Sequence, residues 1–370
     1  MPRKISQSKL ISNLTIYLVY PASDKVISTP DAIGFHLKYW LKKFGFRVIH
    51  FSLIEDVDEK FIPSKSDILL GHPRFSEDST FLKLQKKQGW RKVIVLHPFC
   101  PKDLFSYAFL YKTCLNADKF LAITGRYWAD NISNTIFSSW KDKFTQLDLG
   151  VSKQNYPRIK IKFNPPGKRK FLFVGNHPHY KNVKFLDQIA KCFPEIEFHR
   201  IGPIGKFKHL IQHGSFKLND QYATKLIKQM DFMITMGIRD ANPTTVLECA
   251  SLGLISVCPE GSGYYETDGV YNICGYDIKK AKKTISLLNH LPNRILEKKR
   301  ASMDALISKR YTWRNFSVKV MNEILKKETE TYQFNSHLDV LKINIYLALH
   351  KKASWRVELK KMFYSFFRKL

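Results

Sequence analysis

Short apolar runs alternate with amphipathic stretches along the first half of the chain. These runs have the length of buried strands and occupy residues 14–20, 47–51, 67–70, 92–96 and 119–123. Residues 31–44 carry Ile33, Leu37 and Leu41 at helical spacing, which predicts a helix after the first strand. Strands that alternate with helices predict a parallel, doubly wound sheet.

The second half of the chain repeats this pattern. Its apolar runs lie near Phe171, Phe198, Phe232, Leu254 and Tyr271. Residues 157–168 are rich in proline, lysine and asparagine, so we place a domain boundary there. A chain of 370 residues is long enough for two domains that each bury a core. We therefore predict one α/β domain over 1–155, a second over 156–330, and a helical tail over 331–370.

The most informative stretch is Arg239–Cys258. It predicts a polar loop, a short helix, a glycine stop and a buried strand in succession. Asn242 suits the N-cap and Pro243 the first helical turn, while Gly253 suits the C′ position after the helix. The amides after Pro243 would then form a positive helix terminus that can bind an anion such as a diphosphate.

Two acids flank this helix start. The amides belong to Thr244, Thr245 and Val246, and the carboxylates are those of Asp240 and Glu248. At the usual helical rise, Glu248 lies roughly 7–8 Å along the axis from the helix start. The two acids could accept hydrogen bonds from sugar hydroxyls on either side of a bound diphosphate. An ordinary capped helix with two incidental acids is the alternative.

A second phosphate-binding unit is predicted around Gly175. Residues 170–174 are typical of a buried strand, and Asn176 and Lys181 precede an apolar-periodic helix over 183–193. A strand, a glycine turn and a helix with a basic residue at its start together indicate a phosphate-facing unit. For Lys181, a solvated lysine at a helix start is the alternative.

These two units resemble the donor site of the family 4 retaining glycosyltransferases. Those enzymes have the GT-B fold, in which two Rossmann-like domains face each other across a cleft. The family's two acids match Asp240 and Glu248, with aspartate in place of the first glutamate. Its Gly-Arg-x-x-x-x-Lys-Gly pattern matches at the glycine and the lysine, whereas asparagines 176 and 182 replace the arginine and the second glycine.

The resemblance implies a reaction and assigns roles to residues. A sugar would move from a nucleotide-diphosphate sugar to a hydroxyl of a glycan or lipid-linked acceptor, with retention and without a metal. Asp240 would bind the donor sugar, Glu248 the ribose and Lys181 the diphosphate. The remaining donor-site candidates are Gly175, Asn176, Asn242, Pro243, Thr244 and Thr245.

The first domain would bind the acceptor. Gly34, at the opening of the first helix, stands where the family has a glycine that lets the backbone approach the phosphates. His97 follows a strand and stands where the family often has a histidine near the reacting sugar, and His72 is its rival. Stretches 147–151 and 311–313 also resemble the family.

Two further patterns could suggest a metal site. Asp56-Val57-Asp58 matches a metal motif of the other glycosyltransferase fold, but a solvated acidic turn is the better explanation. His177 and His179 have no apparent third ligand. The six cysteines have no paired spacing, which favours buried thiols in a reducing compartment over disulfides or zinc. We therefore expect no metal cofactor.

The formal net charge of +29 indicates an anionic partner. Residues 351–370 carry seven Lys/Arg and one Glu, with apolar residues at helical spacing, as in an interfacial helix on anionic lipid. Packing of this helix on the first domain is the alternative. No run approaches the ~20 apolar residues of a membrane span. We therefore expect a cytoplasmic, peripheral membrane protein of cell-surface polysaccharide synthesis.

Two rival functions stay open. The positive charge also suits a nucleic-acid-binding protein or a DNA-modifying sugar transferase, although no nucleic-acid recognition motif is present and we expect no nucleic-acid partner. The departures from the family pattern would also suit a catalytically inactive GT-B scaffold.

Overall fold

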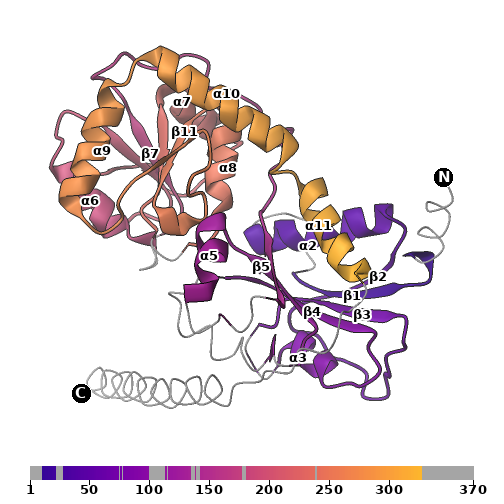
Figure 1. Ribbon diagram of the computed structural model, residues 1–370. Helices are drawn as coiled ribbons and strands as arrows, with labels where there is room; N and C mark the ends of the chain where they lie inside the picture. The colour runs from indigo at the N-terminus through magenta and orange to yellow at the C-terminus, as the bar shows by residue number, and fades with distance from the viewer. Residues whose placement is uncertain are drawn as a thin grey trace, which may run out of the picture.

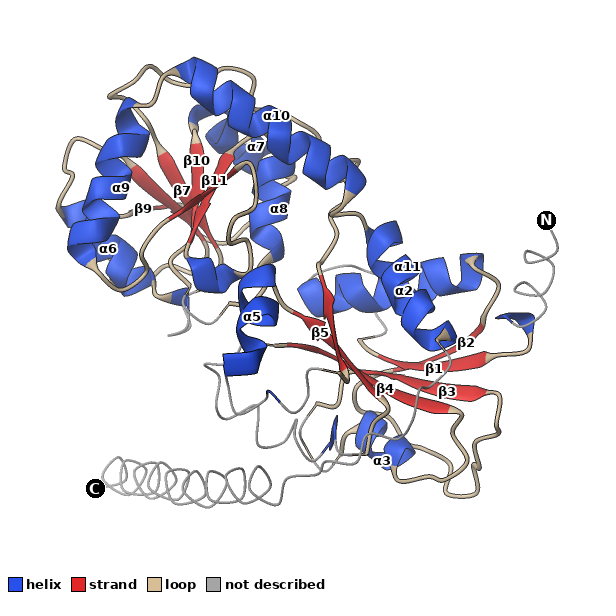
Figure 2. Ribbon diagram, viewed as in Figure 1, coloured by secondary structure: helices blue, strands red, loops and turns tan. Residues whose placement is uncertain are grey.

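Two α/β domains make up the part of the chain that the computed structural model describes (Figure 1). The described residues are 11–21, 28–74, 76, 78–99, 113–114, 116–134, 138, 142–176, 181–237 and 240–326. Each domain is built on a six-stranded sheet with helices packed against it (Figure 2). Every strand pair in both sheets is parallel, as the alternation of strands and helices predicts.

The first sheet has the strand order β2-β1-β3-β4-β5-β6. Its strands are β1 Thr15–Val19, β2 Arg47–Phe51, β3 Asp67–Gly71, β4 Lys92–Pro98, β5 Lys119–Ile123 and β6 Phe144–Leu147. The helices of this domain are α2 Thr29–Lys43, α3 Thr80–Gln85 and α5 Arg126–Asn131, with a 3-10 turn η1 at Ile132–Asn134. Helix α2 begins two residues before the predicted start because Ser28 and Asp31 form a capping box.

The second sheet has the order β12-β11-β10-β7-β8-β9. Its strands are β7 Phe171–Val174, β8 Phe198–Ile201, β9 Ile211–Gln212, β10 Phe232–Ile234, β11 Ile255–Cys258 and β12 Val270–Asn272. Its helices are α6 Val183–Lys191, α7 Gln221–Gln229, α8 Thr244–Ser251, α9 Ile278–His290 and α10 Asn293–Lys309, with a 3-10 turn η4 at Glu260–Ser262.

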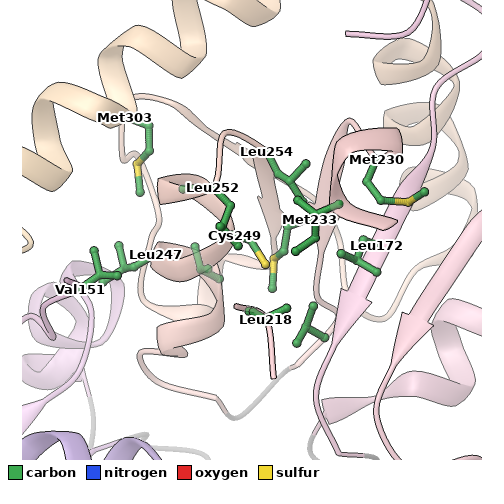
Figure 3. Close-up of a cluster of buried hydrophobic side chains, with 14 of the residues drawn as sticks. Val151, Leu172, Leu218, Met230, Met233, Leu247, Cys249, Leu252, Leu254 and Met303 are labelled. Atoms are coloured by element: carbon green, nitrogen blue, oxygen red, sulfur yellow. The ribbon is translucent and has the colours of Figure 1, made fainter. Parts of the chain in front are cut away.

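Helix α8 is anchored by its apolar face. Leu247 and Cys249 belong to a buried cluster with Leu172 of β7 and Met233 of β10 (Figure 3). Gly253 has a φ of +102°, which confirms the predicted C′ glycine. Burial of this face holds the start of the helix at the carboxyl end of the second sheet.

The last described helix, α11 Trp313–Leu325, returns to the first domain. Trp313, Phe316 and Val320 join the core that covers one face of the first sheet, beside α2 (Figure 1). The ammonium of the buried Lys92 donates to the carbonyls of Glu323 at 3.1 Å and Lys326 at 2.8 Å, which caps the helix end. The predicted range 156–330 for the donor domain is therefore wrong at its end. The predicted tail 331–370 lies outside the described residues.

Within the described residues, the chain passes between the domains twice, near residues 148–151 and near residues 310–313. The two connecting segments are in contact with each other. The amide of Val151 donates to the carbonyl of Tyr311 at 3.0 Å. Arg310 donates two hydrogen bonds to the buried Asp148, at 2.9 and 3.0 Å. A side chain at Gly150 would overlap the backbone of Trp313, so glycine is required for this close approach.

Candidate active site between the two sheets

The carboxyl ends of the two sheets meet. Helix α5 follows β5, and η4 follows β11. The indole of Trp128 in α5 donates to the carbonyl of Gly261 in η4 at 2.8 Å. Gly125 and Gly263 approach so closely that a β-carbon on either one would contact the backbone of the other. Parallel α/β sheets bind ligands at this end, so this region is where a ligand site is expected.

The starts of helices α2 and α8 also meet across the domains. The hydroxyl groups of Thr29 and Thr244, the first residues of the two helices, hydrogen-bond at 2.9 Å. Both helix starts therefore direct their positive ends toward the same interdomain region.

The cap of α8 differs from the predicted one. The N-cap is Pro243, in extended conformation, and Asn242 precedes it. Instead of capping the helix, the Asn242 side chain accepts a hydrogen bond from the amide of Leu149 at 3.1 Å and lies against the hydroxyl of the buried Tyr264. The predicted N-cap role of Asn242 is therefore wrong. Its side-chain oxygen instead binds the segment through which the chain passes from the first domain to the second.

The free amides at the start of α8 are those of Thr244 and Thr245. Neither has a hydrogen-bond acceptor among the described residues. The prediction for Val246 is wrong, because its amide donates to the carbonyl of Pro243 at 3.2 Å. Two unsatisfied amides at a helix start still form a site that favours an anion.

Glu248 lies one turn after Thr244 on the same side of the helix. Burial raises the pKa of its carboxyl group to about 7, and the nearby hydroxyls of Thr244 and Tyr156 partly offset this rise. The hydroxyl of Thr244 in turn hydrogen-bonds with that of Thr29 in the first domain at 2.9 Å. Glu248 therefore lies next to the contact between the two helix starts.

The raised pKa of Glu248 predicts a pH dependence of stability. Between pH 4.5 and about 7 the folded carboxyl keeps a proton that the unfolded one has lost, so the free energy of unfolding falls as pH rises across this window. Glu248→Gln keeps the shape and removes the titration. Urea unfolding at pH 5, 6, 7 and 8 measures the free energy of unfolding of both proteins. We expect the value for the variant minus that for the wild type to increase up to about pH 7 and to stay constant above it. A difference that stays constant with pH contradicts this result.

Lys181 and Asp240 form an ion pair. The ammonium of Lys181 donates to the carboxylate of Asp240, and each side chain is only 17% exposed. Lys181 stands two residues before α6, and Asp240 follows β10, so the sheet brings together two residues that are 59 positions apart. The sequence predicted both residues for one site but not their direct contact.

The turn around this pair has special backbone geometry. Asn182, the N-cap of α6, has a φ of 52°, in the left-handed region that glycine adopts readily and asparagine tolerates. A glycine at this position would adopt the same backbone conformation without strain. Gly175 has a φ of +142°, and the exposed Asn176 follows it. Only glycine adopts such a φ without strain.

The two candidate histidines of the first domain lie together. His72 follows β3, His97 lies in the neighbouring strand β4, and their ring centroids are 4.6 Å apart. Burial lowers the pKa of His97 to about 4, and burial together with His97 lowers that of His72. Both rings are therefore neutral near pH 7. They would act as hydrogen-bonding or packing groups there, rather than as cations.

Gly34 does not open the first helix. It is the sixth residue of α2, and a side chain there would overlap the carbonyl oxygen of Pro21 after β1. Gly34 thus permits close packing of α2 on the end of β1, and Ser28 and Thr29 form the helix start. That its backbone approaches the phosphates stays a prediction.

The alternative metal patterns gain no support. Asp56 and Asp58 are exposed in a loop, and His177 and His179 lie outside the described residues. No group of three or more His, Cys, Asp or Glu side chains in the described part of the chain is placed to hold a metal ion. None of the helices described here has both the length and the apolar character that a membrane crossing requires.

Comparison with known proteins gives a fold. No protein-family model and no curated protein match the sequence. Among solved structures, the chain is similar to a glycosyltransferase from Rickettsia africae with a TM-score of 0.59 and 12% identity, over 85% of this chain and 99% of that one. An E. coli structure bound with UDP-2-fluoro glucose matches with a TM-score of 0.61 and 11% identity, over 85% and 100% of the two chains.

A third similar structure is an alpha-glucosyltransferase in complex with UDP and a 13-mer DNA. It matches with a TM-score of 0.54 and 10% identity, over 85% of this chain and 100% of that one. The three matches span both domains together with their relative arrangement. This protein has the GT-B fold.

The GT-B arrangement also reveals residues that the sequence did not single out. Thr29 and Trp128 make contacts between the domains, Tyr156 lies next to Glu248, and Tyr264 donates to the carbonyl of Pro243 at 3.1 Å. The Ser-Thr-Pro-Asp stretch at 28–31 is a capping-box pattern that marks the start of α2. Tyr156 and Tyr264 have no such signal, because their roles depend on distant partners.

Proposed function

We propose that this protein is a glycosyltransferase that uses a nucleotide-diphosphate sugar as donor. One observation carries the proposal: Lys181 and Asp240 are paired beside the start of α8, which also carries Glu248. A cation and free helix amides favour the diphosphate, and carboxylates favour the hydroxyls of the sugar and the ribose. The GT-B fold agrees with the proposal without identifying the substrate.

In the proposed reaction, the bond between the sugar's anomeric carbon and the diphosphate oxygen breaks. The acceptor hydroxyl forms the new bond, and its proton leaves with the diphosphate. Negative charge that develops on the leaving group would meet the ammonium of Lys181 and the amides of Thr244 and Thr245, which are already oriented. We propose retention of configuration and no metal requirement, on the family resemblance and on these fixed charges.

A thermal-shift screen tests the donor proposal. A ligand that binds only the folded state raises the unfolding midpoint, so UDP, GDP or ADP at a hundred times its Kd adds about 2.7 kcal/mol of stability. We expect one of the three to raise the midpoint by several degrees, and the matching nucleoside to do so less. If none of the three shifts the midpoint at millimolar concentration, the proposal fails.

We propose that the acceptor is a glycan or lipid-linked molecule at an anionic membrane surface on the cytoplasmic side. The basic, apolar pattern of residues 351–370 supports this proposal, and so does the outward side of α2. Phe35 and Tyr39 are 39% and 43% exposed there, among Lys38, Lys42 and Lys43, and residues 34–47 contain no acid. Exposed aromatic and basic groups on one helix are typical of an interface with anionic lipid.

Charge reversal on α2 tests the membrane proposal. We expect wild type to float with vesicles that contain phosphatidylglycerol and to lose at least tenfold of this binding when Lys38, Lys42 and Lys43 become glutamate. The same change at Lys280, Lys282 and Lys283 of α9 alters the net charge equally on the other domain and is expected to have a smaller effect. Equal losses in the two variants would mean that only the net charge matters.

DNA is the alternative acceptor, favoured by the charge of +29 and by the DNA-bound structure with the same fold. It predicts salt-dependent binding of duplex DNA and no flotation with vesicles. An inactive scaffold would not bind a nucleoside diphosphate, and its function would not require Lys181 and Asp240.

A further inference from the structure

Arg200 is a fully buried arginine at the carboxyl end of β8. Its guanidinium donates to the carbonyls of Pro203 and of Gly175, the latter at 3.4 Å, and to the side chain of Gln212 at 3.3 Å. Gln212 in turn accepts from the amide of Gly205 at 2.8 Å. One buried side chain therefore joins the turn after β7 to the loop after β8.

The carbonyl of Gly175 is held from two sides. Arg200 donates to it, and the α-carbon of Gly202 lies so close that a side chain there would overlap the carbonyl oxygen. The amide of Gly175 also points toward β8, where it donates to the carbonyl of Ile201 at 2.9 Å. The backbone of Gly175 is thus committed to the β8 side of the sheet.

This arrangement sets the direction of the next amide. In a trans peptide the N–H points opposite to the preceding C=O, and the described residues contain no cis peptide. The amide of Asn176 must therefore point away from β8. In the sheet order β10-β7-β8, that direction leads toward the end of β10, where Asp240 and Lys181 are paired.

We infer that Arg200 is a positioning residue for the donor diphosphate. Through the peptide between Gly175 and Asn176, it orients the Asn176 amide as a hydrogen-bond donor to the same phosphates that Lys181 and the start of α8 bind. This role rests on the proposed function. A buried guanidinium needs hydrogen-bond acceptors, and Arg200 finds them in the two turns that it joins.

The matched control is Arg169, which is the other fully buried arginine among the described residues. It also donates to backbone carbonyls, those of Asn164 and Leu291, but it precedes β7 and lies at the amino end of the second sheet. Arg169→Met and Arg200→Met therefore remove equivalent buried groups from opposite ends of one sheet. Both are expected to lower the thermal midpoint.

Calorimetric titration with UDP and with uridine distinguishes the roles of the two arginines. If the wild type binds GDP or ADP more tightly than UDP, that diphosphate and its nucleoside are used instead. We expect Arg200→Met to raise the Kd for the diphosphate about tenfold, the effect of one charge-assisted hydrogen bond, with the nucleoside Kd within twofold of wild type. Arg169→Met should leave both constants within twofold. Arg200→Lys, which keeps the charge but reaches fewer carbonyls, should fall between and serves if the methionine variant does not fold.

The positioning role would be overturned if Arg200→Met weakened the binding of the diphosphate and of the nucleoside equally. It would also be overturned if Arg200→Met and Arg169→Met changed the diphosphate Kd equally. Unchanged diphosphate binding in Arg200→Met and Arg200→Lys would overturn it as well, while the proposed function stands. If wild type binds none of the three diphosphates, both proposals fail together.

Discussion

Replacing Lys181 with methionine is expected to lower kcat by about 10²–10³-fold, the usual loss when one oriented group that stabilises a leaving anion is removed. The side chain of Lys181 is 17% exposed and its ammonium group is already paired with Asp240, so its charge is little screened by solvent. Turnover of the donor identified in the thermal-shift screen measures this effect. Lys184→Met, on the exposed side of the same helix, is the control and should retain full activity.

A double variant separates catalysis from stability. Lys181→Met alone leaves the part-buried carboxylate of Asp240 without its partner, which costs stability. Adding Asp240→Asn removes that charge, so the midpoint of unfolding should recover while turnover stays low. Recovery of both would assign the pair a structural role. Wild-type turnover in Lys181→Met, in Asp240→Ala and in Glu248→Ala would mean that these residues do not form the reaction site. Absence of turnover in the wild type with every donor would leave the inactive scaffold as the better explanation.

The inner strands of the sheets could be predicted because they are buried on both faces. The run 119–123 coincides with β5 and the run 92–96 lies within β4, since a parallel strand covered by helices needs a continuous apolar stretch. The two-residue strand β9 escaped prediction, because Ile211 and Gln212 give no periodic signal. Helix α11 shows another limit: its apolar face indicates burial but not which of the two sheets it covers.

The position of the candidate site residues in the fold was predictable where it depends on residue type and spacing. Asp240, Lys181 and Gly175 come to the carboxyl end of the second sheet because each follows a strand or precedes a helix there, and Glu248 lies one turn into α8. Their partners were not predictable. Asn242 suits an N-cap by residue type, yet its side-chain oxygen accepts a hydrogen bond from the amide of Leu149, 93 residues away. Such tertiary contacts override local preference because they satisfy a buried donor.

Gly125→Ala is the second change with a large expected effect, and it acts on the contact between the domains. Gly125 has φ −96° and ψ 173°, which alanine adopts without strain, so the first domain itself should tolerate the change. The new methyl group would overlap the backbone of Gly263 in the second domain. The domains must therefore separate at α5 and η4, and the contact between Trp128 and Gly261 must lengthen.

Separation by about 1 Å is enough to lower turnover by about 10²-fold, because the acceptor must approach the donor from the opposite domain. The affinity for the nucleoside diphosphate should stay near that of wild type, since its predicted ligands lie in the second domain, and small-angle scattering should show a larger radius of gyration. Gly214→Ala is the control: its φ is +80° and no atom lies within 4 Å of the new methyl, so it strains one loop without touching the other domain. If Gly125→Ala keeps full turnover, the contact between α5 and η4 is not part of the catalytic arrangement. The reaction would then take place in a form in which the two domains lie further apart.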